Sequence, residues 1–105
     1  METQFKKGVI EICVLQEIKK EDTYGYSLVK KLADILDIGE STIYTMLRKL
    51  TKEGYLEVYT IPGTDGPRRK YYKISDFGRD RLYSLRYEWR DFINRVEEVI
   101  GGDDE

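Results

Sequence analysis

The stretch ESTIYTMLRKLTKEGYL, residues 40–56, decides the fold of this 105-residue chain. Its apolar residues recur at the i, i+3, i+4 and i+7 positions that form one face of a helix: Ile43, Met46, Leu47 and Leu50. This spacing predicts a helix from Glu40 to Glu53 with a single stripe facing a core. Gly54 stands directly after it, where a helix often ends in the left-handed conformation that glycine adopts without strain. The opposite face is polar and is expected to meet solvent or a partner.

Further elements are predicted on both sides of this helix. The upstream sequence predicts two helices, Phe5–Ile18 and Tyr24–Leu36, with Thr23 as the N-cap of the second. Downstream, two strands flank the turn-forming residues PGTDGP: Tyr55–Ile61 and Arg68–Ser75. The order helix, helix, short turn, helix, hairpin and final helix predicts a mainly α (α+β) fold. This fold is a winged helix-turn-helix in which the hairpin is the wing.

The final helix, Asp76–Ile100 with Ser75 as its predicted N-cap, is too long for so small a core, since its residues at 1.5 Å each make a rod of about 37 Å. Its apolar residues follow a heptad seam: Leu82, Leu85, Trp89, Phe92, Val96 and Val99, widened by Ile93 and Ile100. Because the first helix is too short to cover this seam, we predict that it pairs with a second copy in a homodimer. The alternative is a monomer in which the final helix folds back as an ordinary core helix. The predicted organisation is a winged helix-turn-helix domain over residues 1–75, a dimerisation helix over 76–102 and a disordered tail over 103–105.

The composition excludes several classes of function. The chain has no histidine and one cysteine, which excludes His-based catalysis, Ser-His or Cys-His dyads and an internal disulfide. The sequence contains no metal-ligand cluster and no phosphate-binding glycine loop, so we predict neither an enzyme nor a cofactor or metal site. No apolar run approaches the roughly 20 residues that span a bilayer, and the start METQFKK is not typical of a secretion signal. The expected location is the cytoplasm, without membrane association.

Charge is polarised along the chain, although the formal net charge is only −2. Residues 41–75 carry seven cations against three anions, whereas residues 76–105 carry five cations against nine anions. A local basic surface is what binding to a polyanion requires. An acidic helix beyond the Debye length of about 8 Å is largely screened from DNA. The pattern therefore predicts a nucleic-acid-binding head and an acidic dimerisation rod.

The polar face of the Glu40–Glu53 helix and the wing supply the residues predicted to bind DNA. They bear hydroxyls or cations: Ser41, Thr42, Tyr44, Thr45 and Arg48 on the helix, and Arg68, Arg69, Lys70 and Lys73 on the wing. Hydroxyl and N–H groups at the start of a helix suit phosphates or base edges, and long cations suit phosphates. The helix is expected to enter a major groove while the wing holds the backbone. The alternative is that the same basic face binds an acidic protein.

The aromatic residues around this region are assigned mainly to packing. Strand alternation places Tyr72 on the core face of the wing and places Arg69 and Lys73 on the other face. Tyr24 and Tyr26 are predicted to pack within the helix-turn-helix rather than to contact DNA.

Three stretches resemble the PadR-like transcriptional regulators, in the short form with a single C-terminal helix. They are TYGYSLVKKL, ESTIYTMLRKLTKEGYL and GPRRKYYKISDFGRDRL, which cover most of residues 24–82. The resemblance implies a homodimeric winged-helix DNA-binding protein, usually a repressor. Tyr44 falls on the tyrosine of the family's recognition-helix motif, and Arg68, Arg69 and Lys70 fall on the basic run of its wing. We therefore expect a ligand-responsive repressor that binds palindromic operator DNA as a homodimer.

The segment RYEWRDFINRVEEVI, residues 86–100, resembles the C-terminal helix of a multidrug-responsive member of this family. In that member a tryptophan from each subunit sandwiches flat aromatic drugs, and Trp89 falls on it, which implies a planar aromatic effector. Two symmetry-related indoles near a dyad also pack poorly and tend to leave a slot. The predicted lining is Trp89, Phe92, Ile93 and Val96 with Phe5 and Val9 of the first helix. The alternative is that Trp89 only packs within the seam.

Overall fold

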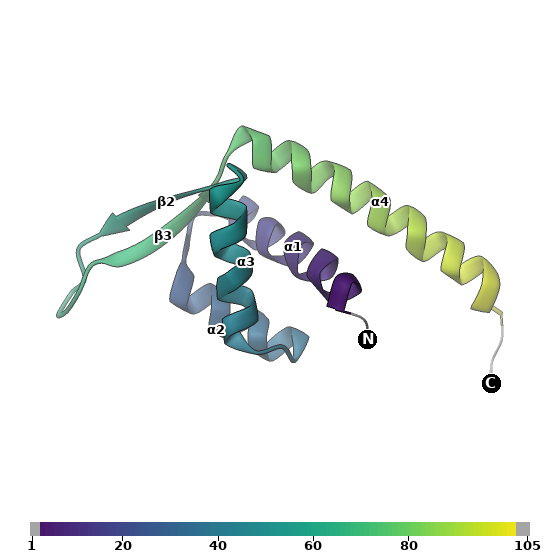
Figure 1. The fold of residues 1–105 in the computed structure, drawn as a ribbon, viewed down its shortest axis with the longest axis horizontal. Helices are drawn as coiled ribbons and strands as arrows, with labels where there is room; N and C mark the ends of the chain where they lie inside the picture. The colour runs from purple at the N-terminus through teal and green to yellow at the C-terminus, as the bar shows by residue number, and fades with distance from the viewer. Residues whose placement is uncertain (1–2, 103–105) are drawn as a thin grey trace.

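The computed structural model describes residues 3–102, with side chains from residue 6 onward. This part of the chain forms four helices and three strands: α1 (Thr3–Lys20), β1 (Thr23–Tyr24), α2 (Gly25–Leu36), α3 (Glu40–Lys52), β2 (Leu56–Ile61), β3 (Arg69–Ile74) and α4 (Asp76–Ile100). The β2–β3 hairpin projects from one side of the helical core and α4 extends from the other (Figure 1). The predicted winged helix-turn-helix is confirmed, and every predicted element lies within two residues of its observed bounds. The predicted tail, residues 103–105, lies outside the described residues.

The sheet has one strand more than the predicted hairpin. β1 pairs antiparallel with β3, in the order β1-β3-β2, with Thr23 opposite Tyr72 and Tyr24 opposite Tyr71. The prediction of Thr23 as an N-cap is therefore wrong. Its hydroxyl donates to the carbonyl of Glu21 at 2.8 Å, and α2 begins after Tyr24 without a side-chain cap. A strand of two residues is too short to show an alternating pattern. Its pairing also depends on a partner far along the chain, which local sequence does not reveal.

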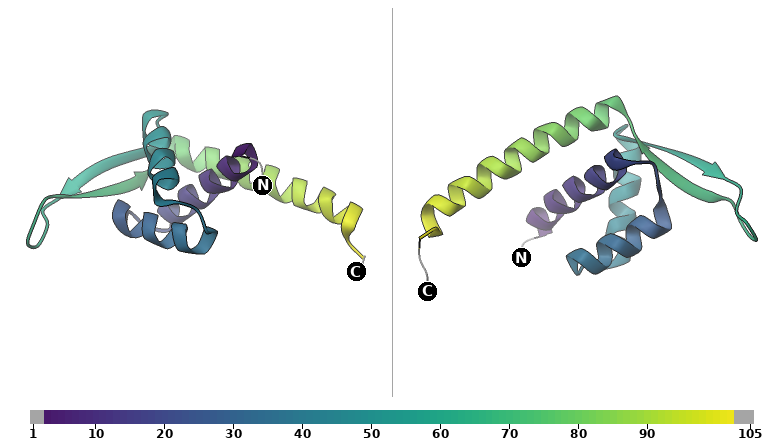
Figure 2. Two further views of the ribbon diagram at one scale, coloured as in Figure 1. Left: turned by 60° about the horizontal axis from the view of Figure 1, so that its bottom comes forward. Right: turned by 180° about the vertical axis from the view of Figure 1, so that it is seen from behind.

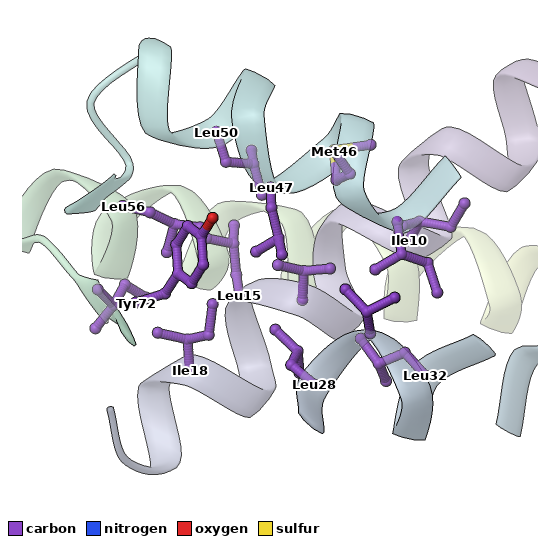
Figure 3. Packing of buried hydrophobic residues seen from close by; sticks show 14 of the residues in the cluster. Ile10, Leu15, Ile18, Leu28, Leu32, Met46, Leu47, Leu50, Leu56 and Tyr72 are labelled. Carbon is purple, nitrogen blue, oxygen red and sulfur yellow. The ribbon is translucent and has the colours of Figure 1, made fainter. Parts of the chain in front are cut away.

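A single hydrophobic core joins the helices to the inner face of the sheet (Figure 3). It contains Leu15 and Ile18 of α1, Leu28 and Leu32 of α2, Leu47 and Leu50 of α3, Leu56 and Tyr72 of the sheet, and Leu82 of α4. The four apolar residues of the predicted α3 stripe are all buried. Tyr72 is only 9% exposed, which confirms its predicted place on the core face. Its ring packs so closely on the start of α2 that a Cβ at Gly25 would lie 2.7 Å from its Cε1 atom.

The start of α4 is held against the base of the wing by hydrogen bonds and a close backbone contact. Ser75 caps the helix as predicted, accepting a hydrogen bond from the Gly78 N–H at 3.0 Å, and its hydroxyl donates to the Gly54 carbonyl at 2.7 Å. A Cβ at Gly78 would lie 2.1 Å from the carbonyl oxygen of Tyr55, so this close approach requires glycine. Gly54 itself has a φ of 85°, the left-handed conformation predicted after α3.

α1 runs beside the first half of α4 and ends before its second half (Figure 2). Glu11 of α1 is 5% exposed and accepts two hydrogen bonds from the Arg81 guanidinium, at 2.9 and 3.2 Å. Further along α4, Phe92 and Val99 are exposed, at 51% and 84%, whereas Ile93 and Val96 are half-buried. The molecule is consequently elongated, 55 Å by 28 Å by 21 Å. None of the helices within residues 3–102 is long and apolar enough to cross a membrane.

Candidate nucleic-acid interface

The residues of α3 that were predicted to bind DNA lie together on its outer face. Ser41, Thr42, Thr45 and Arg48 are exposed, and Tyr44 is half-buried. The Thr45 hydroxyl donates to the Ser41 carbonyl at 2.8 Å, and Nη2 of Arg48 donates to the Thr45 hydroxyl at 3.2 Å. A guanidinium has five N–H donors, so this one bond orients Arg48 along the helix without using up its capacity to bind a ligand.

Tyr44 and Arg48 lie where α3 meets the sheet. Burial raises the pKa of the Tyr72 hydroxyl, nearby Tyr44 adds to that rise, and the cation of Arg48 opposes it. Tyr44 also packs against the hydrophobic core that contains Tyr72. Lys70 is exposed and shares the inner face of β3 with Tyr72, because alternate residues of a strand point the same way. The junction of α3 with the wing therefore carries hydroxyl groups and cations from both elements.

The four wing cations lie in different surroundings. Nε and Nη2 of Arg68 donate to the side chain and carbonyl of Thr60 at 2.9 and 3.0 Å, which fixes Arg68 across the hairpin. The guanidinium of Arg69 lies 5.1 Å from the ring centroid of the β1 tyrosine, on the outer face of the sheet. Lys73 shares that face with Arg69, whereas Lys70 lies on the opposite one. Only some of these cations can therefore face the same surface as α3.

Two residues of α2, Tyr26 and Lys30, extend this region, and neither was predicted to do so. Tyr26 is 53% exposed, but its ring lies 5.9 Å from that of Tyr24, so part of its predicted packing is present. Tyr24 also stacks on Tyr71, with ring centroids 5.7 Å apart. Nζ of Lys30 lies 5.4 Å from the Tyr26 ring centroid and 3.0 Å from Oε2 of Glu40, the first residue of α3. Only a slight signal in the sequence indicates this role, namely that Tyr26 is an aromatic residue on the polar side of a predicted helix.

A groove of about 240 Å³ lies between α1 and α4. It is lined by Gly8, Val9, Ile12, Leu85, Glu88, Trp89 and Phe92. The groove thus brings together three residues of the predicted effector slot, Val9, Trp89 and Phe92. Ile93 and Val96 are half-buried and do not line it. The side chain of Phe5 lies outside the described residues. Within residues 3–102, no group of three side chains is arranged to hold a metal ion.

The architecture defines the class of protein. Two helices joined by a short turn present the second helix outward, and a wing on a three-stranded sheet lies beside it. This is the winged helix-turn-helix class. Residues 14–84 match the transcriptional regulator PadR-like family. The chain belongs to this family, whose members are transcriptional regulators rather than enzymes.

Solved structures agree with this assignment. A transcriptional regulator from Streptococcus is 38% identical with a TM-score of 0.83, and the match covers 93% of this chain and 98% of that one. A PadR-like transcriptional regulator from Bacillus cereus is 34% identical with a TM-score of 0.81, over 96% of this chain and 100% of that one. PadR from Bacillus subtilis, solved in complex with operator DNA, is 26% identical with a TM-score of 0.64, over 72% of this chain and 45% of the longer neighbour.

Proposed function

We propose that this protein is a ligand-responsive repressor that binds palindromic operator DNA as a homodimer. The observation that carries the proposal is the outer face of α3, which bears four exposed polar residues and half-buried Tyr44 on a helix that contacts β2 of the wing. The likeness to PadR of Bacillus subtilis, whose structure contains operator DNA, supports the same role for this chain.

In this proposal α3 enters the major groove and the wing binds the neighbouring backbone. Arg48 has the length and the donor geometry to bind the O6 and N7 atoms of a guanine. Ser41 and Thr42, at the start of α3, present hydroxyls to phosphates or base edges, and Tyr44 and Thr45 add hydrogen bonds beside them. Among the wing cations Arg68, Arg69, Lys70 and Lys73, those that face the same surface as α3 supply contacts to phosphates that hold the protein without reading sequence.

The homodimer forms through the α4 seam. Leu82 and Leu85 pack on the core at the start of α4, and the seam continues along the helix through Trp89, Phe92, Val96 and Val99. Phe92 and Val99 are exposed in the isolated chain, so a second copy would remove them from water. Pairing of two α4 helices would also set the separation of the two α3 helices. Half-sites about 34 Å apart, one turn of DNA, would suit such a dimer.

The groove between α1 and α4 is the proposed effector site. Its volume of about 240 Å³ is smaller than the roughly 300–1,000 Å³ of most ligand sites, and a second copy would enlarge it across the dimer axis. A planar aromatic molecule would stack on Trp89 and contact Val9 and Phe92. Such a ligand regulates DNA binding only if it binds one separation of the two heads better than the other.

Binding to a palindromic duplex tests the function directly. We expect Arg48→Ala to weaken binding at least about tenfold, a loss within the range of one specific base contact, while the dimer persists. Arg95→Ala is the matched control, because Arg95 is an exposed arginine of α4 that pairs with Asp91. Unchanged affinity of Arg48→Ala would refute the assignment of α3. If the wild-type protein bound an acidic protein but no duplex at low salt, the alternative that the basic face binds an acidic protein would replace DNA binding.

The effector site is tested by the fluorescence of Trp89, which is the single tryptophan of the chain. We expect flat cationic aromatic dyes to quench it, and we expect Val9→Asp to reduce the quenching because Val9 lines the same groove. No response across a broad panel of dyes would rule out this site.

A further inference from the structure

Lys30 lies beside the start of α3, although the DNA contacts proposed above do not include it. Its Nζ atom donates a hydrogen bond to Oε2 of Glu40 at 3.0 Å. The side chain of Lys30 is 51% exposed and that of Glu40 is 45% exposed. Tyr26 lies on the same side of α2, with its ring 5.4 Å from the Lys30 ammonium. A half-exposed aromatic ring, a cation and the first residue of the recognition helix therefore meet at one corner.

We propose that Lys30 and Tyr26 form a binding site for a backbone phosphate of DNA, and that Lys30 exchanges its ion pair with Glu40 for this phosphate when DNA binds. This inference rests on the proposed function and adds α2 to the interface. The ligand is a phosphodiester of the strand that passes the start of α3.

Position supports this assignment. The Lys30–Glu40 bond holds the ammonium beside the first residue of α3, where Ser41 and Thr42 follow directly. Phosphates succeed one another about every 3.4 Å of helix axis along one strand of DNA. A strand close enough to touch the hydroxyls of Ser41 and Thr42 therefore brings a phosphate within reach of the long, flexible Lys30 side chain.

Charge supports the exchange of partners. The hydrogen bond to Glu40 raises the pKa of Lys30, and nearby Tyr26 and Tyr44 add to the rise, so the ammonium stays charged at neutral pH. An ammonium has three donors and can move from a carboxylate to a phosphate without leaving its corner. An approaching phosphate repels the exposed carboxylate of Glu40, which favours the exchange. The Tyr26 hydroxyl can donate a second hydrogen bond to the same phosphate.

The first test is the salt dependence of DNA binding by Lys30→Gln and its control Lys31→Gln. Lys31 is also on α2, is 53% exposed and is ion-paired, but its partner is Glu17 of α1. Losing one phosphate contact lowers the magnitude of the slope of log affinity against log salt by about 0.9. Between 50 and 200 mM salt, the factor by which affinity falls should therefore be about 3.5 times smaller for Lys30→Gln than for wild type. Lys31→Gln should keep the wild-type slope. Equal changes in both variants would show a general effect of net charge and overturn the site.

A second test removes the competing carboxylate. Glu40→Gln should bind DNA several-fold more tightly than wild type at low salt. Glu53→Gln, which removes the acidic partner of Lys49 at the other end of α3, should have a smaller effect. Tyr26→Phe should weaken binding modestly without changing the salt slope, because it removes a neutral donor.

The outcomes separate this site from the proposed function. If wild type binds no duplex at low salt, the proposed function fails. If wild type binds DNA with a normal salt slope and Lys30→Gln keeps that slope, only the α2 site fails, and the Lys30–Glu40 pair merely links two helices. Thermal melting of each variant shows whether the fold is intact, and Glu40→Gln tests the site even if Lys30→Gln is unstable.

Discussion

The two halves of α4 have the same apolar pattern but different surroundings. In the first half, Leu82 is 2% exposed and Arg81 bonds the buried carboxylate of Glu11. In the second half, Phe92 is 51% exposed and Val99 is 84% exposed. The difference arises because α1 ends near the middle of α4, where Val9 and Ile12 line a groove with Trp89 and Phe92, and does not reach the C-terminal end of α4 (Figure 2). A heptad pattern therefore shows that a helix face needs a cover, but it does not say which part of that cover comes from the same chain.

The largest effect is expected from truncating the covered half of the seam. Leu82→Ala should lower the free energy of unfolding by about 2–5 kcal/mol, because it leaves a cavity in the core. Val99→Ala should change it by less than about 0.5 kcal/mol at concentrations where the chain is monomeric, because Val99 is already in water. Urea unfolding measures both values. Similar losses in the two variants would contradict the contrast between the halves.

Placing a charge in the uncovered half should act on association instead. Phe92→Asp is expected to weaken dimerisation at least about tenfold, because a carboxylate would have to be desolvated between two helices. Tyr87→Asp is the matched control, since Tyr87 is a 70% exposed aromatic residue of α4 outside the heptad seam. Sedimentation equilibrium gives the dissociation constants. A wild-type protein that stays monomeric at micromolar concentration would remove the dimer from the proposed function.

The polar contact of the covered half is expected to contribute less than its core. Glu11→Gln should cost about 1–2 kcal/mol in the free energy of unfolding, since it leaves the half-exposed Arg81 without its carboxylate. Asp91→Asn, which breaks an exposed pair with Arg95 on the uncovered half, should cost less than about 0.5 kcal/mol. A larger loss in Asp91→Asn than in Glu11→Gln would show that burial does not set the strength of these two pairs.

The smallest effect concerns the acid stability of α1. Hydrogen bonds from Lys20 and Lys31 lower the pKa of Glu17 below its ordinary value. A carboxyl group whose pKa is depressed in the folded state stabilises the fold above its ordinary pKa, and that stabilisation is lost as pH falls through the folded pKa. Glu17→Gln should therefore lose less stability than wild type when the pH drops from neutral to acidic values below the folded pKa. Urea unfolding at both pH values tests this, and equal losses would contradict the assignment.

The site was predictable where it depends on one element and not where it depends on two. The outer face of α3 and the inward position of Tyr72 follow from helical and strand periodicity, which are local properties. The places of Tyr26 and Lys30 do not, because the angle between α2 and α3 brings Lys30 to Glu40. The bond from Arg68 to Thr60 likewise depends on the hairpin register, which pairs Thr60 with Lys70.

The amino-acid sequence by itself determined the order of the elements, the buried stripe of α3, the Ser75 cap and the existence of an α4 seam. Each of these depends on residues a few positions apart, whose spacing is set by the geometry of a helix or strand. Only the tertiary structure decided that β1 joins the sheet, that Arg81 donates hydrogen bonds to Glu11, and that the part of α4 covered by α1 ends near Trp89. These features join residues far apart in the chain, and their meeting depends on how whole elements pack.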